Sequence, residues 1–291
     1  MTKRFLWCGI LALTWMAAFA DWAGAGVLTP GGYGGGLLKA SLIEPTTIAN
    51  LKLWLKADAG VTMDTTLGST TVARWANQAA TGSAYDATQG VKASQPQLVS
   101  DALNHLPSLH FDGVDDWLDL PAAAGGILRN IPGATVFMIV SGGPPTNSQR
   151  YLLQFNTQSY TVARLVIYRE YNGAVYKDSM AGRNGDAAAM SYLTKTLATP
   201  SAYAVNTYVA DFVNRSASIT VASNNSTAST SGWTTAASNT DNINATQPRI
   251  GSGVNAAYYY GNIVEILIYD RTLSASERAL IEAYLLSRSG L

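Results

Sequence analysis

The feature that most constrains the fold is a series of strand-length segments that are separated by turn residues. Residues 51–60 read LKLWLKADAG, and three leucines alternate there with Lys52, Trp54 and Lys56, as they do in a half-buried strand. Asn172-Gly173 is a strong hairpin signal. Further segments of this kind span residues 134–143, 163–173, 203–214, 217–225 and 261–270. The chain is therefore predicted to be rich in β-strands.

Residues 261–270 read GNIVEILIYD and are predicted to form a strand that is buried on both sides. Val264, Ile266 and Ile268 would lie on one face, and Glu265, Leu267 and Tyr269 on the other.

The only convincing helical pattern follows this strand. Ser274 and Glu277 form a capping box, and apolar residues recur on one helical face at Leu280, Ile281, Tyr284 and Leu285. Many short strands and one helix predict an all-β protein, specifically a jelly-roll β-sandwich of antiparallel strands with one C-terminal helix.

Composition argues against several classes of protein. Nineteen Lys and Arg residues balance nineteen Asp and Glu residues, and no basic run occurs, so nucleic acid is not an expected partner. Cys8 is the only cysteine, which excludes a disulfide within the chain. A Gly-x-Ser-x-Gly nucleophile motif is absent, and neither His105 nor His110 has a cysteine nearby that would complete a metal site.

The chain is expected to have three parts. Residues 1–23 combine Lys3 and Arg4 with an apolar run and resemble a secretory signal peptide, with an uncleaved anchor as the alternative. Residues 24–44 are rich in glycine and predict a tether. Residues 45–291 form the predicted jelly-roll domain. Export would place the protein outside the cell or on its surface, and the alternative location is a virion.

Four segments carry a resemblance to a known family, among them ASITVASNN, which begins at Ala217, and PRIGSG, which begins at Pro248. FDGVDDWLDLP begins at Phe111, and GNIVEILIYDRTLSASERALIEAYL begins at Gly261. Together they resemble the concanavalin A-like lectin/glucanase superfamily, in its laminin-G-like branch from bacteria and phages. The likeness covers residues 45–291 and implies the jelly-roll fold. This fold hosts lectins, glycosidases, adhesion domains and virion proteins, so the resemblance alone does not select a function.

The resemblance also allows a test for enzymatic activity. Members that cleave laminarin carry three carboxylates at alternate positions of one strand. Here the corresponding strand offers Glu265 and Asp270, an odd number of residues apart, which alternation sends to opposite faces. We therefore predict no catalytic residues and a protein that is not an enzyme, and a glycoside hydrolase is the least favoured hypothesis.

Four aspartates surround a tryptophan in the stretch His110 to Pro121, HFDGVDDWLDLP. One interpretation is structural: Asp112-Gly113 makes a turn, and Asp115 or Asp116 accepts hydrogen bonds from backbone amides. The alternative is a calcium site formed by Asp112, Asp115 and Asp116, because carboxylate oxygens are ligands that calcium takes. Calcium is the only cofactor that the sequence suggests.

Aromatic side chains supply the candidate ligand-binding residues. Trp117 is expected to fill core space. Trp233 has no apolar neighbours in sequence and is a candidate for an exposed platform, and packing under a loop is the alternative. Tyr258, Tyr259 and Tyr260 are consecutive, so alternation sends at least one ring away from the others.

We therefore predict a surface-displayed binding or adhesion module whose partner is a glycan or cell-surface polysaccharide. The alternative is a phage virion protein, a decoration or receptor-binding component, that contacts other virion or surface-assembly proteins through residues 1–44.

Overall fold

The structure is a computed structural model. It describes residues 43–66, 68–144, 146, 148–155, 164–183, 190–233, 248–253 and 256–291. These residues belong to one compact unit, Ser41–Leu291. The predictions for residues 1–23, and nearly all of the predicted tether 24–44, lie outside the described residues. Among those described, no helix has both the length and the apolar character needed to cross a membrane.

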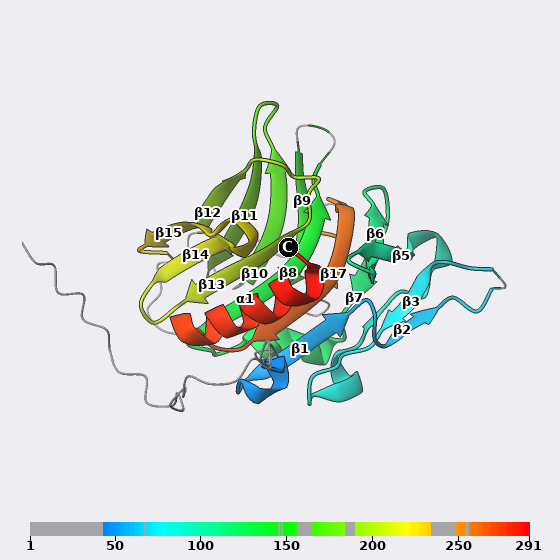
Figure 1. The fold of residues 1–291 in the computed structure, drawn as a ribbon, viewed down its shortest axis with the longest axis horizontal. Coiled ribbons are helices and arrows are strands. Elements are labelled where there is room, and N and C mark those ends of the chain that lie inside the picture. The colour runs from blue at the N-terminus through cyan, green and yellow to red at the C-terminus, as the bar shows by residue number, and fades with distance from the viewer. Residues whose placement is uncertain are drawn as a thin grey trace, which may run out of the picture. The chain divides into compact units, whose positions relative to one another are not determined.

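The strands form two antiparallel sheets (Figure 1). The eight-stranded sheet contains, in order, β15 (Ser226–Ser231), β14 (Ser216–Val221), β13 (Ala204–Asp211), β8 (Gly133–Gly142), β17 (Tyr260–Tyr269), β6 (Leu106–Asp112) and β5 (Gln97–Leu103), and β1 (Leu51–Lys56) also pairs with β17. The nine-stranded sheet contains β12 (Ser191–Leu197), β11 (Tyr176–Arg183), β10 (Arg164–Tyr171), β9 (Ser148–Phe155), β16 (Arg249–Ile250), β7 (Leu118–Asp119), β4 (Ala87–Thr88), β3 (Val72–Trp75) and β2 (Val61–Met63). The part of the chain that the structure describes contains one α-helix, α1 (Ala275–Ser289), which follows β17.

The described residues include five short 3-10 helices, of which the first precedes β1 and the other four lie between strands. They are η1 (Pro45–Thr47), η2 (Gly82–Tyr85), η3 (Lys92–Ser94), η4 (Ala122–Leu128) and η5 (Ala222–Asn224).

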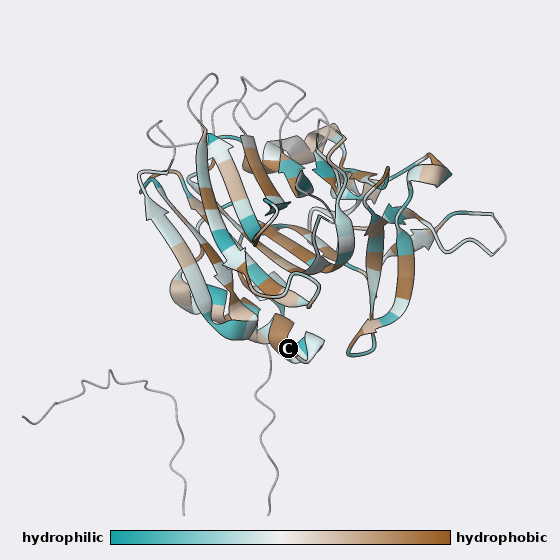
Figure 2. Cartoon of the chain, turned by 90° about the horizontal axis from the view of Figure 1, so that it is seen from above, coloured by the Kyte–Doolittle hydropathy of each residue, from teal (hydrophilic) through white to brown (hydrophobic). Residues whose placement is uncertain are grey.

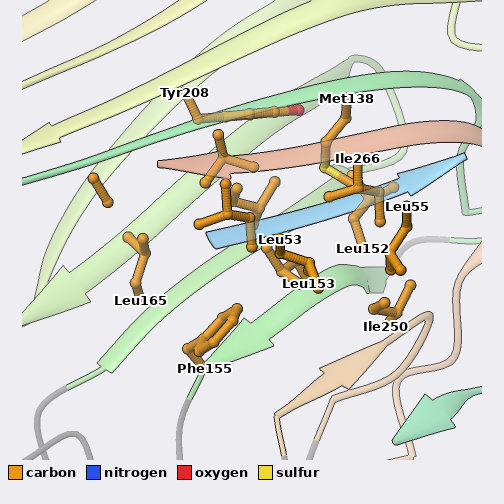
Figure 3. Packing of buried hydrophobic residues seen from close by; sticks show 14 of the residues in the cluster. Leu53, Leu55, Met138, Leu152, Leu153, Phe155, Leu165, Tyr208, Ile250 and Ile266 are labelled. Carbon is orange, nitrogen blue, oxygen red and sulfur yellow. The ribbon is translucent and has the colours of Figure 1, made fainter. Parts of the chain in front are cut away.

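The main core lies between the two sheets. Leu53, Met138 and Ile266 project from the eight-stranded sheet, and they pack with side chains such as Leu152 and Leu165 from the other sheet (Figure 3). Brown apolar bands on the strands alternate with teal polar ones (Figure 2), as expected where one face of a strand is buried. The prediction of an all-β sandwich with one C-terminal helix is confirmed.

Helix α1 covers the outer face of the eight-stranded sheet at β8, β13 and β17 (Figure 1). The predicted capping box is present, since the Ser274 side chain accepts a bond from the Glu277 backbone N–H and the Glu277 carboxylate accepts one from the Ser274 backbone N–H. Ile281, Tyr284 and Leu285 of the helix are buried against Phe137 and Leu267 of the sheet. This helix is why strand β17 is buried on both faces, as predicted.

The predicted distribution of side chains along β17 is wrong at one position. Val264 packs on the helix side together with Leu267, whereas Ile266 and Ile268 face the main core. The cause is a register shift between Ile263 and Glu265, where one strand gains a residue relative to its partner. Period-two alternation cannot reveal such a shift.

The two sheets are joined at one end of the sandwich. Thr71, next to β3, forms an isolated bridge with Gln97 of β5. The backbone N–H of Val72 donates to Pro96 O at 2.8 Å, and that of Leu98 donates to Thr70 O at 2.8 Å. We call this region the sheet junction, and the candidate site lies beside it.

Candidate functional site

A cleft of about 640 Å³ lies at the sheet junction. It is lined almost entirely by side chains that can form hydrogen bonds. The lining residues are Thr71, Lys92, Ala93, Gln95, Gln97, His110, Asp112 and Asp116.

Strand β6 places two polar side chains in the cleft. Leu109 and Phe111 are fully buried in the main core, so alternation turns His110 and Asp112 to the outer face of the sheet. His110 is fixed there, because its Nδ1 lies 3.1 Å from the Asn262 Oδ1 of the paired strand β17. Apolar residues on one face of β6 thus align the polar groups on the other.

The floor of the cleft is held by glutamine and threonine side chains. Thr71 donates to Gln95 Oε1 at 2.7 Å, and Gln95 Nε2 donates to Gln89 O at 2.8 Å. At the rim, the Lys92 ammonium lies 3.7 Å from a carboxylate oxygen of Asp64. The cleft therefore combines a fixed polar floor with a charged rim.

Residues Asp112 to Asp116, which we call the aspartate loop, lie along one side of the cleft. Asp112 Oδ1 accepts hydrogen bonds from the backbone N–H groups of Val114, at 2.8 Å, and Asp115, at 3.3 Å. Asp116 Oδ2 accepts one from the Asp112 N–H at 2.9 Å. Gly113 has φ +77° and lies against Tyr260, so a Cβ there would meet Tyr260 Cβ at 2.9 Å. The predicted turn and the predicted carboxylate-to-amide bonds are confirmed.

The same loop brings three carboxylates together. Asp112, Asp115 and Asp116 each have an oxygen within 4.8 Å of the others. Burial, with added repulsion from Asp112 and Asp115, raises the pKa of Asp116 to about 7, although its bond from the Asp112 amide opposes the shift. A bound cation would relieve this repulsion, so the donor set fits the calcium ion predicted from the sequence.

The raised pKa of Asp116 predicts a pH-dependent stability. Between its unfolded pKa of 3.8 and its folded pKa of about 7, the folded state binds more protons, so stability falls as pH rises through this range. Asp116→Asn removes this effect and should raise the free energy of unfolding by about 2 kcal/mol near pH 8, allowing for solvent screening.

The measurement is urea unfolding of both proteins in a chelator, at several pH values between about 4 and 8. The difference in the free energy of unfolding between the two proteins isolates the contribution of Asp116, because other carboxylates such as Glu277 contribute equally to both. A difference that stays constant across the pH range would contradict the prediction.

Tyr258, Tyr259 and Tyr260 have three different environments. Tyr259 is fully buried, Tyr258 is half-buried and Tyr260 is 43% exposed, so the predicted divergence of the rings is confirmed. The Tyr260 ring lies 6.1 Å from that of His110 in an edge-on arrangement. Tyr260 is therefore the exposed aromatic side chain beside the cleft.

Trp117 is not the core residue that was predicted. It is half-buried, and its ring stacks on Tyr258 at 6.0 Å with the Arg249 guanidinium 5.1 Å from the ring centre. Its Nε1 donates to Asp119 Oδ2 at 3.1 Å. The neighbouring Leu118 occupies the core position instead, so alternation turns Trp117 outward.

The prediction that Trp233 is an exposed platform is wrong. Its side chain is 1% exposed and packs against Phe212, with ring centres 5.6 Å apart. Its backbone N–H donates to Arg215 O at 2.7 Å, which folds the residue back under the sheet. The apolar neighbours that bury it are distant in sequence, so its polar local sequence was misleading.

Glu265 and Asp270 do not line the cleft. Glu265 is fully buried and accepts a bond from Trp54 Nε1 at 2.6 Å and another from Arg288 Nε at 3.1 Å. Asp270 pairs with Lys52 at 3.3 Å. Both carboxylates have structural partners.

Sequence reasoning missed most of the cleft, including Thr71, Gln95, Gln97 and His110. One usable signal was present, because a core position for Phe111 requires His110 and Asp112 to share the opposite face. Gln97 of β5 and Thr71, just before β3, reach the cleft because two segments distant in sequence pair, and no local sequence pattern indicates that pairing.

No model of a known protein family matches the sequence, and a search of curated proteins gives no significant match. Solved structures do match the fold. The binding domain of Paraclostridial Mosquitocidal Protein 1 matches with a TM-score of 0.56 and 9% identity, over 84% of this chain and 53% of that one. The botulinum neurotoxin serotype D binding domain gives 0.54 and 9%, over 81% and 51%. The Trypanosoma rangeli sialidase gives 0.52 and 15%, over 83% and 33%.

This chain thus spans about half the length of the two binding-domain chains and a third of the sialidase chain. At these identities the likeness shows the fold, a β-sandwich that these proteins share.

Proposed function

We propose that this protein is a non-enzymatic binding module that recognises carbohydrate in the cleft at the sheet junction. The observation that carries the proposal is the cleft itself, in which amide, hydroxyl, imidazole and carboxylate groups converge beside the exposed ring of Tyr260. Sugars present hydroxyl groups along their edges and C–H groups on their faces. Convergent polar groups next to an aromatic ring suit both features.

Exposed apolar side chains also gather around this site. Val91 is 57% exposed and directly precedes the cleft residue Lys92, and Val114 is 68% exposed within the aspartate loop. Together with Tyr260 they add exposed apolar surface next to the charged rim of the cleft, and exposed apolar side chains flanked by polar ones mark interaction sites.

The comparisons support a binding role at the level of the fold. Two of the matched structures are named as binding domains, and the third is a sialidase. We place this chain in the concanavalin A-like superfamily as part of the proposal, on the sequence segments that resemble it. The Glu265 carboxylate is bound by Trp54 and Arg288 away from the cleft. It is therefore not placed to act there as an acid or a nucleophile, which supports the proposal of a non-enzymatic module.

Removing the exposed ring tests the proposal. Tyr260→Ala should weaken carbohydrate binding about 5- to 30-fold, because stacking on a sugar face contributes about 1–2 kcal/mol. The measurement is a glycan array with wild-type protein, followed by calorimetric titration of the strongest array oligosaccharide.

Tyr192→Ala is the matched control, because Tyr192 is 60% exposed on β12, outside the cleft lining. Its affinity should equal that of the wild type. An array without signal at millimolar sugar would overturn the proposed function. Equal losses of affinity in both variants would show that the cleft is not the sugar-binding site.

We also propose that Asp112, Asp115 and Asp116 hold a calcium ion, with water or sugar hydroxyl groups completing its coordination. Millimolar calcium should then stabilise the protein by about 1–2 kcal/mol at neutral pH, given the affinities typical of extracellular sites. Thermal unfolding with calcium, magnesium or a chelator measures this effect.

Asp115→Asn should abolish the stabilisation by calcium. The matched control is Asp101→Asn, which changes an exposed aspartate whose partner is His105. A wild-type protein that shows the same unfolding temperature with calcium and with chelator would rule out the ion.

A further inference from the structure

Tyr259 is fully buried, and its neighbours in sequence are the half-buried Tyr258 and the exposed Tyr260. Its hydroxyl donates to the backbone oxygen of Ser141 at 2.7 Å, and its ring packs against Phe111 with 6.2 Å between centres. Its backbone N–H donates to Gly251 O at 2.7 Å. Tyr259 therefore contacts the end of β8, the end of β6 and the segment after β16 at the same time.

The backbones of β8 and β17 approach unusually closely at this point. Gly142 has φ +106°, and a Cβ there would lie 2.5 Å from Gly261 Cα. Gly261 has φ +149°, and a Cβ there would lie 2.2 Å from Ser141 O and 2.9 Å from the Tyr259 hydroxyl oxygen. The two glycines are needed for this approach, and the Tyr259 hydroxyl occupies the space beside them.

The hydroxyl group is kept in its neutral, donating form. Burial raises the pKa of Tyr259 to about 12, although the nearby Arg169 guanidinium opposes the shift. Arg169 also donates to Gly142 O and, at 3.2 Å, to Pro200 O. Two side chains from the main core thus hold consecutive carbonyl groups of β8, at Ser141 and Gly142.

The close approach of β8 and β17 lies next to the cleft residues of β6. Gly261 pairs with Phe111 and with Gly142, and Tyr260 pairs with Asp112. A shift of the first residues of β17 would therefore move Tyr260 relative to His110 and Asp112. It would also move Tyr258 relative to Trp117.

We propose that Tyr259 is the positioning residue of the cleft: through its hydrogen bond to Ser141 O it fixes the start of β17, and with it the placement of Tyr258 and Tyr260. This inference rests on the proposed function for its binding consequence. Tyr259 does not contact the sugar, since its side chain is fully buried.

Tyr208 provides a matched control. It is 1% exposed, and its hydroxyl group accepts a bond from Asn206 Nδ2 at 3.3 Å. It belongs to β13, which does not pair with β17. Tyr208→Phe and Tyr259→Phe each remove one buried hydroxyl group and keep the ring, so both variants are expected to fold.

The first readout needs no sugar. Hydrogen–deuterium exchange should be about tenfold faster in peptides covering Tyr258 to Ile263 in Tyr259→Phe, because the start of the strand opens locally. In Tyr208→Phe the same peptides should exchange within about twofold of the wild-type rate. Faster exchange in both variants, or in neither, would overturn the inference.

The second readout is affinity for the oligosaccharide that gives the strongest wild-type array signal. Tyr259→Phe should bind it about 5- to 10-fold more weakly, and Tyr208→Phe should bind like the wild type. Equal affinities of the two variants would overturn the binding part of the inference. If wild-type protein binds no sugar, the proposed function fails, and exchange still decides whether Tyr259 fixes the strand.

Discussion

Arg169→Met is expected to lower the free energy of unfolding by about 3–5 kcal/mol, because it leaves the buried Asp178 carboxylate without its cation. Arg169 and Asp178 are 1% and 0% exposed, and Arg169 Nε donates to Asp178 Oδ1 at 2.8 Å. Asp178 also accepts from Asn206 Nδ2 at 2.6 Å, so the pair connects the two sheets through the main core. Urea unfolding at neutral pH measures the loss.

A neighbouring pair gives the control. Glu170 and Lys177 occupy the next register position of the same two strands, with side chains 18% and 28% exposed and a separation of 3.3 Å. Lys177→Met should cost less than about 1 kcal/mol, because solvent screens that pair.

The double change Arg169→Met with Asp178→Leu provides a further check. It should recover part of the loss, since it removes both charges. What it leaves unsatisfied is the carbonyl groups of Gly142 and Pro200, which lose their donor, and Asn206 Nδ2, which loses Asp178 as its acceptor. If the double variant were as unstable as the sum of its single variants, the two charges would not act as a pair.

Glu265→Ala is expected to cost about 2–4 kcal/mol of the free energy of unfolding. The change deprives the buried Trp54 Nε1 of its acceptor and removes one of two carboxylates bound to Arg288, the other being that of Asp58. These contacts attach the C-terminal end of α1 to β17 and β1. Chemical denaturation followed by tryptophan fluorescence reports the change.

Glu265→Gln separates the two causes, because the amide oxygen still accepts a bond from Trp54. Its cost should be less than half that of Glu265→Ala. Glu282→Ala is the control on the same helix, since Glu282 is half-buried and accepts from Thr207 Oγ1 at 2.6 Å. It should cost about 1 kcal/mol or less. A larger cost for Glu282→Ala than for Glu265→Ala would contradict this account of how the helix is attached.

The parts of the fold that could be predicted from the sequence have local causes. Alternation over residues 261–270 and the hairpin at Asn172-Gly173 depend on neighbours within a few positions. The same is true of the capping box at Ser274 and Glu277. The structure confirms the hairpin, the capping box and the burial of β17 on both faces, while the alternation along β17 fails at Val264. The aspartate loop was also predictable, because a short side chain that bonds amides two and three residues later is a local arrangement.

The predictions that were wrong, and the cleft that was not predicted, concern residues whose partners are distant in sequence. Trp233 is buried by Phe212 and by core side chains from other strands, and nothing in its polar neighbourhood indicates them. Trp117 lies outside the core because Leu118 fills it, a choice between two adjacent apolar residues that depends on register. The cleft requires Thr71 and Gln97 to meet, and that pairing is fixed only when both sheets have formed.

Strand β17 follows in sequence every strand with which it pairs, namely β1, β6 and β8. A chain that emerges from a ribosome at about 5–20 residues per second therefore exposes the apolar faces of those strands before their common partner exists. Closure of the eight-stranded sheet therefore waits until β17 has been synthesised, and it is slowed by contacts of high sequence separation. Until then the edges of β1, β6 and β8 that will pair with β17 carry unpaired backbone groups, which can pair with other chains.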